Sequence, residues 1–215
     1  MTTDGPASGD LRNADWQEPD DRSPVSFWSS AMADVLAHFP VEIRPQTRFA
    51  KCRGWLRIAA TSPGFRATAL YRLAHCARGY LGFVGRVAAG FINWFVRHWY
   101  GSTLSPAARL YGGLILPHPQ SIVIGPGVVL GPRAWIYQNV TLGGAPGKTG
   151  MPKIGADARI LTGAVVSGPV QIGDAVTVCA NCVVSRDVPS GTTVRPAPIV
   201  VSATTRESEP AVPTH

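Results

Sequence analysis

Aliphatic residues recur every six positions through the C-terminal half of the chain. Turn-forming residues follow many of them, as in IGPG, LGPR and IGAD. Each six-residue unit therefore predicts one short strand and one turn, and the units stack into a prism whose aliphatic positions point inward. The positions in phase are Leu104, Leu110, Leu116, Ile124, Leu130, Ile136, Leu142, Ile154, Ile160, Val166, Ile172, Val178 and Val184.

The six-residue count is interrupted twice. Leu116 and Ile124 are eight positions apart, so two extra residues must bulge from the coil there. Leu142 and Ile154 are 12 apart, which keeps the phase but replaces one aliphatic position with the loop GGAPGKTGMPK. The pattern predicts a bulge and a protruding loop on an otherwise regular prism.

The chain before Gly101 has a helical pattern instead. It predicts helices over residues 26–39, 49–60 and 65–78, the last with Phe65, Ala69, Leu70, Leu73 and Ala77 on one face. Gly79 is the expected C-cap of that helix.

Residues 80–100, YLGFVGRVAAGFINWFVRHWY, form the most apolar segment of the chain. The mostly apolar run after Arg86 is about ten residues, Val87 to Val96, whereas a membrane span needs about 20. We therefore expect a helix packed in a bundle or at a subunit interface. A peripheral membrane contact through its aromatic residues stays open.

These patterns divide the chain into four parts. Residues 1–24 are polar and acidic, which predicts a disordered tail. Residues 25–100 form a helical region, 101–201 the repeat domain, and 202–215 a second flexible tail. No apolar signal segment is visible at the N-terminus, so the expected compartment is the cytoplasm.

Charge is distributed unevenly. The net charge is +7, and between Glu42 and Asp157 there are 14 Lys and Arg residues and no Asp or Glu. Such a surface favours an anionic partner, and nucleotide phosphates, an acidic polymer and an anionic membrane all satisfy that condition.

The four cysteines do not indicate a disulfide framework. Cys179 and Cys182 form a CxxC pair, which metal sites and redox proteins also use. They lie on the six-residue repeat and no second CxxC accompanies them, which favours a structural role.

Among residues 101–189 the titratable groups are few. His118 is the only histidine there, and a zinc site of the hydratase type needs three, so we expect no metal. Serine and cysteine nucleophiles have no evident partner base. His118 therefore remains as a general base, in the bulge between Pro117 and Pro119. The alternative is a structural histidine in a loop.

Several longer motifs point to a family. The stretches LILPHPQSIVIG, IYQNVTLGG, PKIG, TGAVVSGPVQIGDAVTV and VVSRDVPSGTTV, with GFRATALYRLAH before them, resemble the serine acetyltransferase branch of the hexapeptide acyltransferases. The resemblance covers residues 49–194. It implies a left-handed parallel β-helix behind an N-terminal helical region, a mainly β protein that forms homotrimers with active sites between subunits.

The resemblance also implies roles for individual residues. His118 matches the catalytic histidine, which takes the proton of the acceptor hydroxyl as the oxygen attacks the thioester of acetyl-CoA. Acetyl-CoA would be the co-substrate. The small residues of its groove match Gly143, Gly144, Thr162 and Ala180, and we expect Lys153 and Arg195 to meet its phosphates.

The chain departs from the family pattern on the acceptor side. Thr103 stands where the family has the aspartate that orients the histidine, and Pro117 where it has an acid. Phe49 replaces a substrate-binding aspartate, and Gly150 and Met151 replace an Arg-His pair. Free serine carries an ammonium and a carboxylate, so the loss of these charges favours a different acceptor.

We therefore expect an acetyl-CoA-dependent O-acetyltransferase acting on a sugar, a polysaccharide precursor or a specialised metabolite, without a nucleic-acid partner. Thr103 and Met151 would lie on the acceptor side. The first alternative is a serine O-acetyltransferase of cysteine biosynthesis, and the second is a non-catalytic β-helix scaffold. The sequence leaves open the acceptor, the acyl chain length, the choice between trimer and hexamer, and the group that orients His118.

Overall fold

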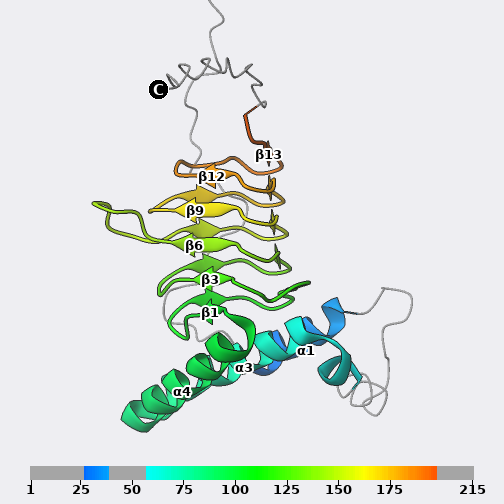
Figure 1. The fold of residues 1–215 in the computed structure, drawn as a ribbon, viewed down its shortest axis with the longest axis vertical. Coiled ribbons are helices and arrows are strands. Elements are labelled where there is room, and N and C mark those ends of the chain that lie inside the picture. The colour runs from blue at the N-terminus through cyan, green and yellow to red at the C-terminus, as the bar shows by residue number, and fades with distance from the viewer. Residues whose placement is uncertain (1–26, 39–56, 198–215) are drawn as a thin grey trace, which may run out of the picture.

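The computed structural model describes residues 27–38 and 57–197, which form a helical base and a prism of short strands above it (Figure 1). The predicted tails, Cys52 and the Phe49 position lie outside the described residues. The helices end at Tyr100 and the first strand begins at Thr103.

The helical base contains α1 (Phe27–Ala37), α3 (Pro63–Tyr80) and α4 (Gly82–Tyr100), and residues 57–61 are also helical. Ser62 caps α3, because its hydroxyl accepts the Phe65 N–H at 3.2 Å and Pro63 needs no partner at the first helical position. Gly101, with φ 61°, ends α4 in the left-handed conformation that glycine adopts without strain.

Two details of α3 differ from the prediction. Gly79 lies inside the helix, which continues to Tyr80 and is capped by Leu81. The buried face contains Ala67, Tyr71 and Arg72, whereas Leu73 is exposed. The reason is that this face meets the backbone of the prism, where hydrogen-bonding groups are needed.

The prism is a left-handed β-helix with three parallel sheets. The first sheet contains β1, β3, β6, β9 and β12, the second β2, β4, β7 and β10, and the third β5, β8, β11 and β13. The strands are β1 (Thr103–Leu104), β2 (Arg109–Leu110), β3 (Val123–Ile124), β4 (Val129–Leu130), β5 (Trp135–Ile136), β6 (Thr141–Gly143), β7 (Lys153–Ile154), β8 (Arg159–Ile160), β9 (Val165–Ser167), β10 (Gln171–Ile172), β11 (Thr177–Val178), β12 (Val183–Val184) and β13 (Thr193–Val194).

The core confirms the six-residue pattern. All 13 aliphatic positions in phase are at most 3% exposed. A second inward ladder, which the six-residue count did not predict, lies two residues before each of them, at small or aliphatic residues such as Ala108, Val128, Ala134 and Val176. Two inward positions per unit fill the prism, which explains its close packing.

Both predicted irregularities are present. Residues 117–121 bulge between the third and first sheets, and residues 144–152 leave the prism between β6 and β7. In Figure 1 this second loop projects sideways from the stack. Within residues 27–38 and 57–197, no helix is both long and apolar enough to cross a membrane.

Candidate active site

His118 lies at the corner where the chain passes from the third sheet to the first. Ile115 forms a bridge with Trp135 of the third sheet, and Val123 pairs with Thr103 and Thr141 of the first. The His118 side chain is exposed, and no partner for it is found in the part of the chain that the structure describes. The imidazole is thus accessible to a ligand.

The backbone around His118 is held from beneath by Ser102. The buried Ser102 hydroxyl donates to the Pro119 carbonyl at 2.7 Å and accepts the Ile122 N–H at 2.9 Å. The Ser121 N–H donates to the Tyr100 carbonyl at 3.2 Å. These bonds fix both ends of the bulge, so the exposed ring sits on a rigid support.

Ser102 was not among the residues predicted from the sequence. It occupies the second inward ladder, where the coils above carry apolar residues, and a buried hydroxyl at such a position needs partners. The identification of that ladder would have singled it out.

Three of the predicted acetyl-CoA residues lie on the same edge of the prism as His118, namely Thr162, Ala180 and Arg195. The corner turns stack through backbone bonds from Asn181 N–H to the Thr162 carbonyl at 2.9 Å and from Gly163 N–H to the Gln138 carbonyl at 3.1 Å. The Asn139 N–H in turn reaches the Gln120 carbonyl at 3.1 Å. We call this corner the histidine edge, which comprises residues 117–121, 137–139, 161–163, 179–181 and, in the last coil, Arg195.

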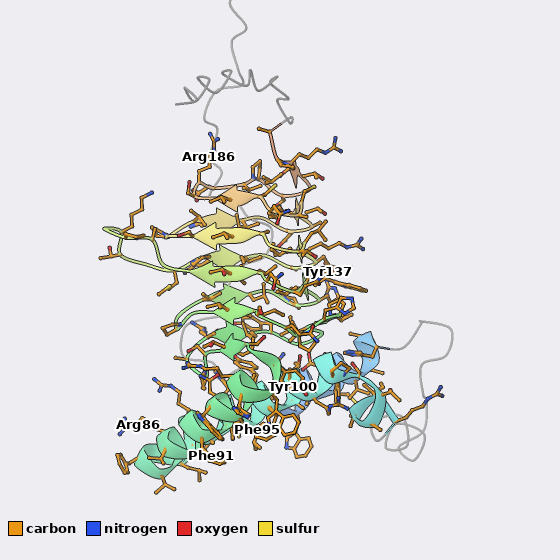
Figure 2. The ribbon with its side chains drawn as sticks, viewed as in Figure 1. Arg86, Phe91, Phe95, Tyr100, Tyr137 and Arg186 are labelled. Carbon is orange, nitrogen blue, oxygen red and sulfur yellow. The ribbon has the colours of Figure 1, made fainter. Side chains whose placement is uncertain are left out.

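The other predicted acetyl-CoA residues lie across the first sheet from the histidine edge. Gly143 ends β6 and Gly144 follows it, and Lys153 is an exposed residue of β7. We call this corner the loop edge, residues 143–152, 167–169 and 185–187. Figure 2 shows Tyr137 of the histidine edge and Arg186 of the loop edge on opposite sides of the prism. One chain therefore separates the predicted site residues into two groups.

Met151 belongs to the loop edge and packs on its own prism. A Cβ added at Gly127 would lie 3.5 Å from Met151 Cγ, and one added at Gly144 would lie 3.5 Å from Met151 Cε. The half-buried side chain thus covers glycine backbone instead of projecting from the loop. Within one chain it is not close to His118.

Thr103 is on β1 and pairs with Val123 of the first sheet. Its half-buried side chain faces outward, next to the inward Leu104. The Thr103 backbone N–H donates to the Ile122 carbonyl at 2.8 Å, but the side chain that holds the bulge is that of its neighbour Ser102. Among the described residues, no side chain is placed to orient the His118 ring.

Gln138 is a further candidate that was not predicted from the sequence. It lies on the histidine edge, and its side-chain Oε1 is enclosed without a hydrogen-bond partner among the described residues. An enclosed amide oxygen accepts a hydroxyl or ammonium proton well, and leaving it unpaired is costly. The sequence offers a signal for Gln138. It lies two residues after Ile136, and the predicted acetyl-CoA residue Thr162 lies two residues after Ile160, so both occupy the same position of the repeat.

A buried polar cluster fixes the chain just before His118. Asp34 of α1 accepts the Gly113 and Leu114 N–H groups at 2.7 and 2.9 Å. Arg72 of α3 donates to Asp34 at 3.0 Å and also to the carbonyls of Leu110 and Tyr111. The helical base thereby positions the coil that leads into the bulge.

Two titratable residues of α3 show that water is largely excluded from the interface between the helical base and the prism. The Tyr71 hydroxyl donates to the Ala108 carbonyl at 2.8 Å, and burial raises the pKa of Tyr71 to about 12. Burial also lowers the pKa of His75, whose Nδ1 is 3.0 Å from the Pro106 carbonyl oxygen. Both groups are uncharged at neutral pH, as expected for structural residues.

The cysteines of the CxxC pair are free, and so is Cys76. Cys182 is buried in the second inward ladder, and burial raises the pKa of its thiol. Such a thiol is a poor nucleophile and a poor metal ligand. Within residues 27–38 and 57–197, no group of three or more His, Cys, Asp or Glu side chains could hold a metal ion.

Known proteins are similar to this chain both in the repeat and in part of the sequence outside it. Residues 151–186 match the bacterial transferase hexapeptide family, a model of six repeats. A serine acetyltransferase from Helicobacter pylori is 35% identical over 136 residues, which cover 61% of this chain and 76% of the relative. The chain belongs to the serine acetyltransferase family.

Other members of the serine acetyltransferase family are also similar. One from Synechococcus elongatus is 35% identical over 145 residues, covering 66% of this chain and 58% of the relative, so the chain spans little more than half of that protein. Two solved structures have a TM-score of 0.65. The Neisseria gonorrhoeae serine acetyltransferase in complex with serine is 32% identical, and the match covers 80% of this chain and 67% of that structure. The soybean serine acetyltransferase complexed with serine is 31% identical, and the match covers 81% of this chain and 70% of that structure.

Proposed function

We propose that the protein transfers an acetyl group from acetyl-CoA to a hydroxyl group, with His118 as the general base. The imidazole takes the hydroxyl proton while the oxygen attacks the thioester carbonyl. The C–S bond then breaks, and the imidazolium returns its proton to the leaving thiolate. The observation that carries this proposal is the position of an exposed, rigidly supported His118 on the same edge as Thr162, Ala180 and Arg195.

Acetyl-CoA fits along the histidine edge. Thr162 and Ala180 have small side chains, so the pantetheine arm can approach the backbone of the stacked turns. Arg195 in the last coil supplies positive charge for the phosphates, at the far end from His118. The thioester would then lie beside the imidazole at the lower end of the edge.

In a homotrimer, the histidine edge of one chain and the loop edge of a neighbouring chain would together complete the site. In a cyclic assembly each chain presents different surfaces to its two neighbours, so the histidine edge of one chain can face the loop edge of the next. Gly143, Gly144, Met151 and Lys153 would then approach the site from the neighbouring chain. The outward ladder of the first sheet supports such packing because it is uncharged: Thr103, Val123, Thr141, Val165 and Val183.

Serine is the acceptor that the comparisons favour over the sugar or metabolite expected from the sequence, since the similar solved structures include complexes with serine. Gln138 Oε1, which has no hydrogen-bond partner among the described residues, would accept the ammonium group once the side chain turns out of its enclosed position.

A second candidate acceptor is an uncharged hydroxyl compound. The packing of Met151 against Gly127 and Gly144 favours it, because the side chain at the position of the family histidine is apolar and directed onto its own prism.

Loss of thioester absorbance with serine, and separately with a panel of sugars, tests the proposal. His118→Ala should lower kcat by roughly 10² to 10⁴-fold, whereas His98→Ala, which removes an exposed histidine of α4, should not. Unchanged turnover in His118→Ala would refute the general-base role. Calorimetric titration of the wild type with acetyl-CoA separates the enzyme from a scaffold, which would show no binding.

A further inference from the structure

The outer face of α4 is exposed and apolar. Phe83, Phe91 and Trp99 are 72%, 66% and 69% exposed, and Val84 and Val87 are also exposed. Such a row of large apolar side chains is rare on a protein surface that faces only water.

The geometry of α4 gathers these residues into one stripe. The helix packs on α3 through Gly85, Ala89 and Val96. At about 100° per residue, the large apolar side chains cover the opposite arc, and Arg86 and Arg97 fall together along one border. His98 is the one polar side chain within this arc, and its ring stacks on Trp94 with the ring centroids 5.5 Å apart. We call this stripe the α4 face: Phe83, Val84, Val87, Phe91, Trp94, Phe95 and Trp99. Figure 2 shows Phe91, Phe95 and Arg86 on this helix, which projects from the base of the prism.

The α4 face continues into a cavity between the helices. The cavity has a volume of about 660 Å³, and most of its lining is apolar, including Phe65, Leu70, Leu73, Phe95 and Trp99. Asp34, Arg66 and Arg72 are the charged residues of its lining. Phe95 and Trp99 belong to both surfaces. An apolar chain that met the α4 face could therefore also enter the helical base.

Charge decides which occupant suits this face. No Asp or Glu occurs between Glu42 and Asp157, so α3 and α4 carry only positive charges, including Arg78, Arg86 and Arg97. A second copy of the same face would bring arginines together with no acid to offset them. An anionic lipid bilayer accepts the aromatic side chains at its interface and attracts the arginines at its headgroups.

We propose that α4 docks on an anionic lipid bilayer, lying in the plane of the interface with the α4 face in the acyl-chain boundary and Arg86 and Arg97 at the headgroups. The tryptophans suit this depth because their rings are apolar and carry a polar N–H. Docking would hold the prism above the membrane surface and does not depend on the proposed acetyl transfer.

Co-sedimentation of the full chain with vesicles tests the proposal. Wild type should pellet with phosphatidylcholine vesicles that contain one third phosphatidylglycerol, and much less with pure phosphatidylcholine. Arg86→Gln with Arg97→Gln should weaken binding on the order of 25-fold, from about 1 kcal/mol per arginine. Phe91→Ser with Trp94→Ser should abolish it, while Trp28→Ser, an exposed tryptophan of α1, should leave it unchanged.

Each result has one interpretation. Wild type that stays in the supernatant with anionic vesicles, or a Phe91→Ser, Trp94→Ser variant that binds as wild type does, overturns the proposal. Sedimentation velocity without lipid adds a second criterion: if the same variant alone has a smaller mass than wild type and wild type does not bind vesicles, the α4 face contacts a second copy instead. Circular dichroism confirms that each variant is folded, and these exposed positions should not alter it.

Discussion

Asp34→Ala tests how strongly the helical base holds the coil that leads to His118. Asp34 and Arg72 have side chains only 2% and 3% exposed, so the change leaves a guanidinium buried without its carboxylate. It also leaves the N–H groups of Gly113 and Leu114 without their acceptor.

The magnitude follows from these contacts. Removal of one partner from a buried ion pair costs about 3 to 5 kcal/mol, and each orphaned N–H costs about 1 to 3 kcal/mol. The terms are not additive because one carboxylate serves all of them. We expect a loss of about 4 to 6 kcal/mol, a large part of the roughly 5 to 15 kcal/mol that stabilises a domain.

Guanidinium unfolding, followed by circular dichroism at one fixed chain concentration, measures this loss. In a double-mutant cycle with Arg72→Met, the coupling energy should be about 1 to 3 kcal/mol. The control is Asp157→Asn, which breaks the exposed pair with Arg133 and should cost less than about 1 kcal/mol. A loss below about 1 kcal/mol for Asp34→Ala, with an unchanged denaturant slope, would refute the reasoning.

Three further changes address the site and its support. Ser102→Ala should destabilise the fold by about 1 to 3 kcal/mol and lower kcat without changing the KM for acetyl-CoA, because the Pro119 carbonyl loses its buried donor; an unchanged kcat contradicts this. His75→Asn tests pH dependence: burial lowers the pKa of His75 below its usual 6.5, so the unfolded chain takes up a proton first and stability falls as pH drops below 6.5. The variant should lose that part of the decline in a series of thermal melts, and identical pH profiles would exclude it. Gln138→Leu should leave the melting temperature unchanged or higher and lower kcat/KM for the acceptor, and a large loss of stability would show that the amide already has partners.

The fold could be predicted from the sequence because the coil repeats a local rule. Every sixth residue must be aliphatic to fill the prism, and the departures at Leu116–Ile124 and Leu142–Ile154 reveal the bulge and the loop directly. The helical base was less predictable. Period alone does not say which face of α3 meets the prism, and that face contains Tyr71 and Arg72 because the first coil presents backbone carbonyls and N–H groups to it.

The sequence by itself determined that His118 is the only histidine among residues 101–189. It also determined that uncharged residues stand where the family has charged residues on the acceptor side. Only the tertiary structure decided which residues share an edge. His118, Thr162, Ala180 and Arg195 are scattered along the chain, and they align because the turns of a β-helix stack one above another. Gly144 is nearer to Thr162 in sequence than His118 is, yet it lies across the first sheet, since a strand separates successive corners of the prism.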